Sequence, residues 1–309
     1  MAKLTHLNEV ERVGNTVLTV GTFDGVHEGH RALMETVVEK AKQRNARSVV
    51  VTFDPHPRTI IHSKSDGIKL LTTLKERAEI LETLGVDVLV VIPFTRDFSL
   101  LSSEEFVKDV IHKKIGISEF IIGYDHHFGK DRSGTIETLE RLGPELNFDV
   151  QVVSKKEMGD TTISSTVIRN EIIDEGNMPK VAELLGRPYM LNALVIHGDE
   201  RGRKIGFPTA NLQPEHQDKA IPKNGIYAVK VRVDGEWFSG MMNIGVRPTF
   251  DGVTKSLEVN IFGFDKMIYG KTVQIRFIDR IRDEQKFSSV DLLVAQLKAD
   301  KEAVLRLLN

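Results

Sequence analysis

Two histidines lie three residues apart, directly after an apolar segment, in a stretch that suits phosphate chemistry. Residues 21–30 read GTFDGVHEGH and follow Thr16–Val20, which we predict to be a strand. The glycines permit a tight turn, and the N-terminus of the helix that follows presents free amide groups to an anion. His27 and His30 share one face of that helix, where they can donate hydrogen bonds to a triphosphate and stabilise charge at the reacting phosphorus. The chemistry indicated is nucleotidyl transfer.

The same two histidines allow two plainer interpretations. They can be ordinary, partly exposed helix residues, or they can be the first two ligands of a zinc site, because a three-residue spacing also suits a metal. A zinc site would need distant His, Asp or Glu ligands, since the chain has no cysteine. The lead-in GTFDG over residues 21–25 favours contact with phosphate.

Three further segments follow predicted strands and can therefore reach the same edge of a parallel sheet, where ligands collect. Residues 53–57 read FDPHP, whose two prolines fix a loop, and a rigid turn explains Asp54 and His56 equally well. Residues 123–130 read GYDHHFGK, in which the paired histidines also fit a solvated turn. Residues 163–169 read ISSTVIR, a run of hydroxyls followed by an arginine at a helix start. These groups suit phosphate, although one hydroxyl alone would serve as a helix N-cap.

The second half of the chain carries a longer motif. Residues 197–211 read HGDERGRKIGFPTAN, with glycines spaced four apart, which matches neither a Walker A loop nor a dinucleotide-binding fingerprint. The glycines and the basic residues between them make a flexible cationic cradle for phosphates. Thr209 and Asn211 lie two apart, so in an extended strand both side chains face one side and can hold Mg²⁺ beside a nucleotide. A turn stabilised by Asn and Pro explains PTAN equally well.

A carboxylate with a candidate role lies in the predicted strand over residues 256–262, SLEVNIF. The apolar residues of this strand share one face, which sends Glu258 and Asn260 to the other. Periodicity does not decide whether that other face is a polar pocket or solvent. Near the end of the chain, residues 281–287, IRDEQKF, have the composition of a charged, solvated turn before the last helix.

Together these motifs resemble the family of bacterial bifunctional riboflavin kinase/FMN adenylyltransferases, also called FAD synthetases. Residues 21–30 resemble the Gly-x-Phe-Asp-Gly-x-His-x-Gly-His signature of the nucleotidyltransferase superfamily, and residues 163–169 resemble its second phosphate-binding signature. Residues 197–211 resemble the riboflavin kinase signature that ends in Gly-Phe-Pro-Thr-Ala-Asn, and they match it without a gap. Residues 281–287 resemble a flavin-binding segment of that family. Residues 123–130 resemble another flavin-binding segment of the family, although the family more often has an acidic or aromatic residue where this chain has two histidines. The resemblance covers essentially the whole chain.

The resemblance implies two ATP-dependent steps that use Mg²⁺. The first phosphorylates the ribityl 5′-hydroxyl of riboflavin to give FMN and ADP, and the second adenylylates FMN to give FAD and pyrophosphate. For the first step it implies Glu258 as general base, with Thr209 and Asn211 holding Mg²⁺. The nucleotide contacts implied for this step come from Gly198, Arg201, Gly202, Arg203, Gly206 and Asn211.

For the second step the resemblance implies that His27 and His30 contact the triphosphate and do the catalytic work. The further ATP or phosphate contacts implied for this step come from Gly21, Phe23, Asp24, Gly25, Ser164, Thr166 and Arg169. The flavin contacts implied are Asp125 and Phe128 in the first half of the chain, and Arg282 and Phe287 in the second.

The elements that must position these residues differ between the two halves. Over residues 1–185, short apolar strands alternate with amphipathic helices, the pattern of an α/β domain with a doubly wound parallel sheet. We expect this half to be the nucleotidyltransferase domain. Capping boxes at residues 73–76 and 102–105 predict two helix starts, the first helix running to Leu84. The predicted strands are Thr16–Val20, 48–53, 86–92, 119–122 and Asp149–Val153.

Over residues 186–309, after a helix at 179–185, apolar residues alternate with polar ones, which is typical of antiparallel strands. An Asp-Gly pair at 234–235 predicts a hairpin. We expect a small antiparallel β-barrel, the kinase domain, closed by an amphipathic helix. The predicted strands are 227–233, 236–242, 256–262 and 272–278, and the predicted helix is 288–308.

Composition sets outer bounds on the function. The 309 residues exceed the usual size of one hydrophobic core, and 40% hydrophobic with 28% charged residues is typical of a globular protein with two cores. A formal net charge of −2 gives no basic footprint, so we expect no nucleic acid partner. The start lacks the apolar core of a signal peptide, and the apolar run at 88–92 is too short to cross a bilayer. We therefore expect a cytoplasmic enzyme that does not bind membranes and whose partners are riboflavin, FMN and ATP. Weak self-association is compatible with this expectation.

Two alternatives stay open at this point. One is an enzyme of the same superfamily that acts on another phosphate acceptor, such as a pantetheine or nicotinamide mononucleotide adenylyltransferase, and the complete second motif argues against it. The other is a flavin-binding regulatory protein with degenerate sites, against which the intact His27, His30, Thr209, Asn211 and Glu258 argue.

Overall fold

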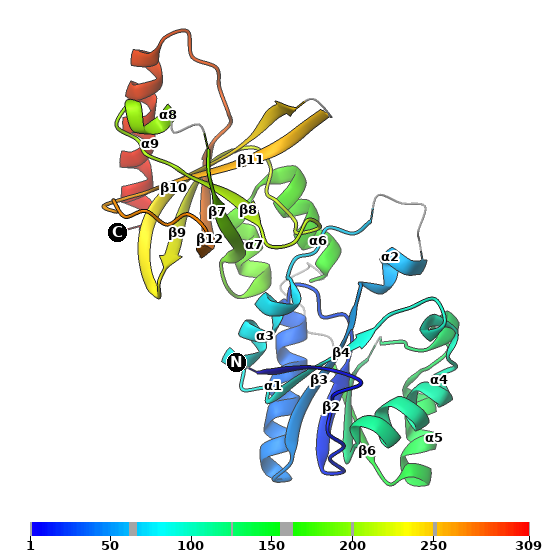
Figure 1. Cartoon of the computed structure of the whole chain (residues 1–309). Coiled ribbons are helices and arrows are strands. Elements are labelled where there is room, and N and C mark those ends of the chain that lie inside the picture. Colours follow the sequence, from blue (N-terminus) through cyan, green and yellow to red (C-terminus); the bar gives the residue numbers. More distant parts are fainter. Residues whose placement is uncertain are drawn as a thin grey trace. The chain divides into compact units, whose positions relative to one another are not determined.

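The chain forms two compact units, Met1–Ser165 and Thr166–Asn309 (Figure 1). The computed structural model describes residues 2–61, 67–124, 126–154, 163–198, 201–249 and 252–308. Contacts divide the chain before residue 186, where the sequence pattern changes, because helix α7 (Met178–Leu185) packs against strands β7 (Tyr189–Ile196) and β12 (Thr272–Arg282) of the second unit.

The first unit is built on a six-stranded sheet in which every described pairing is parallel, in the order β1-β4-β3-β2-β5-β6. The predicted strands are confirmed, and a short strand at the sheet edge, β1, is added to them. Strand β2 is buried along its whole length, as a strand covered on both faces must be. The strands are β1 Lys3–His6, β2 Thr16–Val20, β3 Arg47–Asp54, β4 Val88–Pro93, β5 Glu119–Gly123 and β6 Asp149–Val153.

Helices cover both faces of this sheet. Figure 1 shows α1 (Glu28–Gln43) and α3 (Leu74–Thr83) on one side and α4 (Ser103–Glu105) and α5 (Ile136–Leu146) on the other. Both predicted capping boxes are present, with Thr73 before α3 and Ser102 before α4. The remaining helical segments of this unit are α2 Pro57–Ile61, η1 Phe98–Leu100, the π-helical η2 Phe106–Ile115 and η3 Lys130–Arg132. The predicted doubly wound architecture is confirmed.

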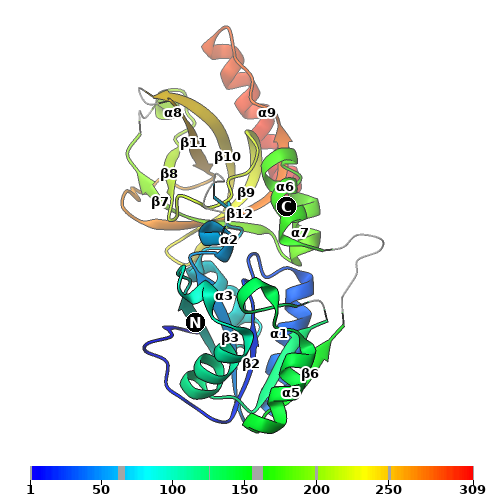
Figure 2. The same ribbon diagram turned by 90° about the vertical axis from the view of Figure 1, so that its right-hand side faces the viewer.

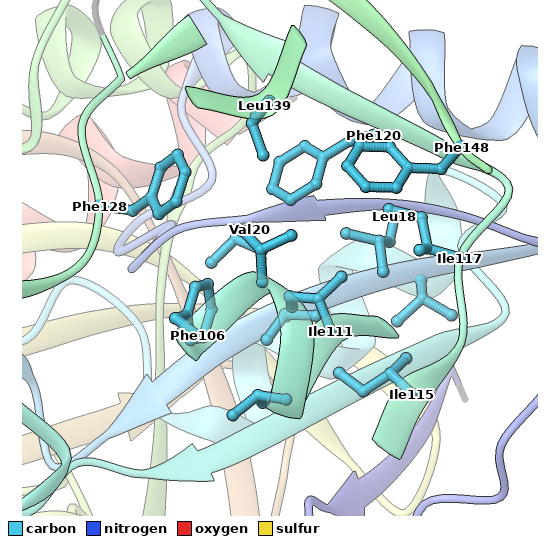
Figure 3. Packing of buried hydrophobic residues seen from close by; sticks show 14 of the residues in the cluster. Leu18, Val20, Phe106, Ile111, Ile115, Ile117, Phe120, Phe128, Leu139 and Phe148 are labelled. Carbon is cyan, nitrogen blue, oxygen red and sulfur yellow. The ribbon is translucent and has the colours of Figure 1, made fainter. Parts of the chain in front are cut away.

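One face of the sheet holds a core of aliphatic and aromatic side chains (Figure 3). Leu18 and Val20 project from β2 and Phe120 from β5, and they meet Ile111 of η2 and Leu139 of α5. All five side chains are at most 2% exposed, so β2 is held rigidly between its neighbours. The residues that follow β2 therefore leave the sheet from a fixed point.

The second unit contains a closed antiparallel barrel with the strand order β10-β11-β8-β7-β12-β9. The predicted barrel is confirmed, and its described strands run beyond the predicted bounds because barrel pairing extends past the alternating segments. Besides β7 and β12, the strands are β8 Ala210–Pro214, β9 Gly225–Val233, β10 Glu236–Thr249 and β11 Gly252–Ile261. The helical segments before the barrel are α6 Ser165–Asn170, η4 Glu171–Glu175 and α7, and a short helix α8, Arg201–Lys204, follows β7.

The predicted closing helix is α9, Val290–Leu308. It packs on the outside of the barrel against β9, β10 and β12 (Figure 2). Val304 of α9 is fully buried and joins a cluster with Ile226, Ala228 and Met241 of the barrel. None of the helices in the described part of the chain is long and apolar enough to span a membrane.

Candidate active sites

The loop after β2 leaves the parallel sheet at its topological switch point. Strands β3 and β4 lie on one side of β2, and β5 and β6 lie on the other. In open α/β sheets, ligands bind beyond the carboxyl ends of the strands at such a reversal. Because β3 and β5 run parallel to β2, the loops that begin near residues 54 and 123 leave the same edge beside it. The topology thus brings three of the sequence motifs together.

The two histidines stack on each other at the start of α1. His27 is the N-cap, and its Nδ1 accepts a hydrogen bond from the His30 amide at 3.4 Å. The ring centroids are 3.6 Å apart, and the Phe23 ring stands edge-on to His30 at 5.2 Å. An accepting Nδ1 assigns the His27 proton to Nε2, which gives this ring a donor suited to a phosphate. Gly21 is required here because a Cβ atom would lie 2.7 Å from the Phe23 ring.

Asp24, within the same motif, points into the protein. Its side chain is 1% exposed and accepts hydrogen bonds from the amides of Leu71, at 2.9 Å, and Thr72, at 3.0 Å. The Gly25 amide donates to the Thr72 hydroxyl at 3.1 Å. The loop is thereby tied to the segment before α3, a connection that the sequence motif did not reveal.

The hydroxyl-rich segment reaches this loop through Ser165. Its Oγ donates to the Asp24 carbonyl at 2.8 Å, so residues 163–165 join the loop within the first unit. Ser164 is half-buried beside it, while Thr166 and Arg169 lie on α6 and belong to the second unit. Among the described residues, no group of three His, Asp or Glu side chains gathers as a metal site would require.

The loop after β5 is anchored by an aromatic side chain. Phe128 is 6% exposed and lies in the core, 6.1 Å from the Phe106 ring and 6.3 Å from the Phe120 ring. Phe128 is thus part of the core of the first unit, which leaves little of its ring for contact with a flavin. Asp125, the other candidate on this loop, falls outside the described residues.

In the barrel, Glu258 faces the residues expected to hold Mg²⁺. Asn211 of β8 lies directly opposite Glu258 of β11, and the Thr209 hydroxyl donates to Glu258 Oε2 at 3.4 Å. Asn260, on the same side of β11, donates to the Pro208 carbonyl at 2.6 Å. This polar face of β11 therefore looks toward residues 208–211 and is not turned wholly to solvent.

Two different physical reasons require glycine in the second motif. A Cβ atom on Gly198 would lie 2.0 Å from Asn211 Nδ2, and one on Gly202 would lie 2.2 Å from the Phe207 carbonyl oxygen. Gly206 has φ +81°, which other residues rarely adopt. The first two glycines therefore let the loop lie directly on the PTAN segment.

Part of the loop is helical. Arg201–Lys204 form a helical turn, α8, and the Phe207 amide donates to the Gly202 carbonyl at 2.9 Å, which closes it. Arg203 is exposed on this turn, and the Arg201 side chain lies outside the described part.

Sequence reasoning missed an aromatic pair at the start of this loop. The His197 and Tyr269 rings stack with centroids 4.0 Å apart. The Gly270 amide donates to the Val195 carbonyl at 2.9 Å, which holds Tyr269 beside the end of β7. The sequence carries no periodic signal for this pair, because it arises from the pairing of β7 with β12.

The expected flavin segment is clamped to α9. Arg282, at the end of β12, donates through Nη2 at 2.7 Å and Nε at 2.9 Å to Asp300, which is 2% exposed. The Arg282 guanidinium also lies 5.9 Å from the centre of the half-buried Phe287 ring. Arg282 therefore holds this segment against α9.

Comparison with known proteins identifies both halves. Residues 10–167 match the family described as FAD synthetase, and residues 185–308 match the family described as riboflavin kinase. A solved structure titled "Crystal Structure of Macrolide-efflux Protein from Streptococcus pneumoniae" is 34% identical with a TM-score of 0.88, and the match covers 97% of this chain and 98% of that one.

Curated relatives named bifunctional riboflavin kinase/FMN adenylyltransferase match nearly the full length. The relative from Listeria monocytogenes is 40% identical over 93% of this chain and 91% of its own. Those from Escherichia coli K12 and Bacillus subtilis are 37% and 35% identical, covering 92% and 98% of this chain and 90% and 96% of their own. The resemblance expected from the motifs is confirmed, and the chain belongs to the family of bifunctional riboflavin kinase/FMN adenylyltransferases.

Proposed function

We propose that this protein converts riboflavin to FMN and then FMN to FAD, each step consuming ATP at its own site. Support comes from the family assignment and, above all, from one structural observation: each compact unit brings together polar residues that the sequence predicts for one of the two steps. The stacked His27 and His30 lie at the switch point of the parallel sheet, and Glu258 faces Thr209 and Asn211 in the barrel.

In the kinase step, Glu258 accepts the proton of the ribityl 5′-hydroxyl while the hydroxyl oxygen attacks the γ-phosphorus of ATP, and ADP leaves. A general base must be able to reach the proton it removes, and the half-buried Glu258 carboxylate lies on the polar side of β11, next to the motif. Gly198, Gly202, Gly206 and the basic residues of the α8 turn, Arg201 and Arg203, surround the ATP phosphates.

The residues beside Glu258 fit a magnesium ion. Mg²⁺ prefers oxygen ligands and keeps water and phosphate for its other positions, which suits the hydroxyl of Thr209 and the amide oxygen of Asn211. When bound there with ATP, the ion neutralises phosphate charge.

In the adenylyl step, an FMN phosphate oxygen attacks the α-phosphorus of ATP and pyrophosphate leaves. His27 and His30 donate hydrogen bonds to the triphosphate and stabilise its developing charge, so no covalent enzyme intermediate is required. Gly21, Phe23, Asp24 and Gly25 shape the turn that presents the amides of α1, and Ser164, Thr166 and Arg169 supply further phosphate contacts.

Flavin contacts and the domain division complete the proposal. We assign Asp125 and Phe128 to FMN in the first site, and Arg282 and Phe287 to riboflavin in the second. We place the functional division near residue 186, with 1–185 as the adenylyltransferase domain and 186–309 as the kinase domain. A cytoplasmic location, the absence of a nucleic acid partner and weak self-association stay predictions.

Product chromatography tests the proposal. Purified protein is incubated with ATP, Mg²⁺ and either riboflavin or FMN. Riboflavin should give FMN and then FAD, and FMN alone should give FAD. Accumulation of FMN without FAD would contradict the first site, and no turnover would favour a flavin-binding protein with degenerate sites.

A further inference from the structure

Arg77 is a buried charged side chain that belongs to none of the motifs discussed above. It lies in the first turn of α3 and is 3% exposed. Arginine is rarely buried to this degree unless its donors are engaged. The groups that engage it belong to, or directly hold, the loop that carries the stacked histidines.

Two of these connections pass through threonine hydroxyls. Arg77 Nη1 donates to Thr52 Oγ1 at 2.8 Å, and that hydroxyl donates to the Thr22 carbonyl at 3.0 Å. Arg77 Nε donates to Thr72 Oγ1 at 3.4 Å, and that oxygen accepts a hydrogen bond from the Gly25 amide at 3.1 Å. Arg77 thus reaches both ends of the Thr22–Gly25 turn.

A third connection is electrostatic. Arg77 Nη2 lies 3.8 Å from Asp24 Oδ1 and donates to the Thr72 carbonyl at 3.3 Å. Burial lowers the pKa of Arg77, while Asp24, Asp54 and Glu76 oppose that effect. The planar guanidinium has five N–H donors in fixed directions, so it can reach the two threonine hydroxyls and the Thr72 carbonyl together. The ammonium group of a lysine lacks this fixed geometry.

The loop that these contacts hold has an unfavourable backbone. Phe23 has φ +45° and Val26 has φ +41°, in the left-handed region that non-glycine residues seldom occupy. Such conformations persist where the surrounding structure enforces them. Held at Thr22, Asp24 and Gly25, the chain turns Phe23 against the His30 ring and places His27 as the N-cap of α1.

We propose that Arg77 is a positioning residue for adenylyl transfer, which acts through Thr52, Thr72 and Asp24 to fix the loop that carries His27 and His30. The inference rests on the proposed function of that loop. It predicts that loss of Arg77 lowers the rate of the step that the histidines catalyse more than it weakens ATP binding.

The experiment compares Arg77→Met, Arg77→Lys and the exposed neighbour Lys75→Met as a matched control on the same helix. For each variant, kcat and the KM for ATP are measured for FAD formation from FMN, and FMN formation from riboflavin is measured on the same preparation. Arg77→Met should lower kcat for FAD formation about 10- to 100-fold, since small misplacement of reacting groups has effects of that size. Arg77→Lys should recover part of kcat, while Lys75→Met and all rates of FMN formation should stay at the wild-type level.

A merely structural role would lower the unfolding temperature and leave kcat per folded molecule unchanged, and that result would overturn the proposal. An equal loss in Lys75→Met would overturn it as well. If Arg77→Met does not fold, Thr52→Val provides the test of the proposal, because it removes the hydroxyl that links Arg77 to the Thr22 carbonyl at nearly constant side-chain volume. A folded Thr52→Val protein should lose about tenfold in kcat for FAD formation, and wild-type kcat would reject the proposal. Failure of the wild-type chain to make FAD would instead overturn the proposed function.

Discussion

Gly198 packs directly beneath the Asn211 side chain: a Cβ atom on Gly198 would lie 2.0 Å from Asn211 Nδ2. No real Cβ contact is that short, so any larger residue at 198 must push the Asn211 amide away. Asn211 lies opposite Glu258 across the β8–β11 pair, and the Thr209 hydroxyl bonds to the same carboxylate. The first glycine of the loop therefore controls where the expected Mg²⁺ ligands stand relative to the general base.

Gly198→Ala should for this reason impair the kinase step. Displacement of Asn211 should lower kcat/KM for FMN formation about 10- to 100-fold, with a raised requirement for Mg²⁺. FAD formation from FMN should be unchanged. Gly14→Ala is the matched control, because nothing lies within 4 Å of its Cβ position and its φ is ordinary. Wild-type kinase activity in Gly198→Ala would contradict this prediction, because the kinase step would then not depend on where the Asn211 side chain lies.

A pair of substitutions should separate the two activities. Glu258→Gln removes the base and should lower FMN formation from riboflavin about 10²- to 10⁴-fold, while FAD formation from supplied FMN continues. His30→Ala removes the ring stacked on His27 and should abolish FAD formation while FMN still accumulates. Chromatography of the products from riboflavin and from FMN gives both rates. Loss of both activities in either folded variant would contradict the assignment of two independent sites.

Much of the architecture is readable from the sequence because local patterns and burial agree. The β-branched and aliphatic residues of Thr16–Val20 predict a strand covered on both faces, and the capping boxes before α3 and α4 predict helix starts that the hydrogen bonds confirm. Strand β1 was missed because its burial pattern has one buried residue in four, which gives neither an apolar run nor a clean alternation. The α8 turn was missed because its hydrogen bond comes from Phe207, beyond the helix itself.

Within the sites, the types of the functional residues were more predictable than the directions in which their side chains point. Strand periodicity places Glu258 opposite the apolar face, but only barrel closure beside β8 decides that this face meets Thr209 and Asn211. Asp24 belongs to a phosphate motif, yet its carboxylate turns inward to the amides of residues 71 and 72. Arg77 gave no signal at all, since an arginine on an amphipathic helix is ordinarily exposed.

The clamp between β12 and α9 should matter for both stability and flavin binding. Asp300→Asn leaves the Arg282 guanidinium, which is 18% exposed, without its counter-ion. We expect a loss of about 2 to 3 kcal/mol in the free energy of unfolding, at or just below the lower end for a broken buried pair because Arg282 is partly exposed. The KM for riboflavin should rise because Phe287 loses its anchored neighbour. Urea unfolding and initial rates of FMN formation measure the two effects.

The same helix provides a control for that substitution. Glu302 pairs with Arg306 at 3.6 Å, with both side chains at least 70% exposed. Glu302→Gln should change neither the KM for riboflavin nor the urea midpoint, since such surface pairs contribute little. Equal stability of Asp300→Asn and Glu302→Gln would show that the clamp is not a stabilising element.

Tyr227 should make the barrel sensitive to alkaline pH. Its hydroxyl donates to the Lys223 carbonyl, and burial raises the pKa of Tyr227 to about 12, against the opposing effect of Arg280. The folded protein therefore keeps this proton at pH values where the unfolded chain, with the ordinary value of 10.0, has released it. A raised folded pKa gives stability that is complete below the unfolded pKa and is lost as pH rises toward the folded one.

Tyr227→Phe isolates that contribution. At about pH 8 the variant should be less stable than wild type by about 1 kcal/mol, the usual loss for one hydrogen bond. Between about pH 10 and about pH 12 the wild type should lose about 1 to 2 kcal/mol of stability that the variant does not lose, so the two stability curves should meet or cross. Urea unfolding of both proteins in steps across that window measures the difference. Parallel curves would mean that the Tyr227 hydroxyl ionises in the folded barrel as readily as in the unfolded chain.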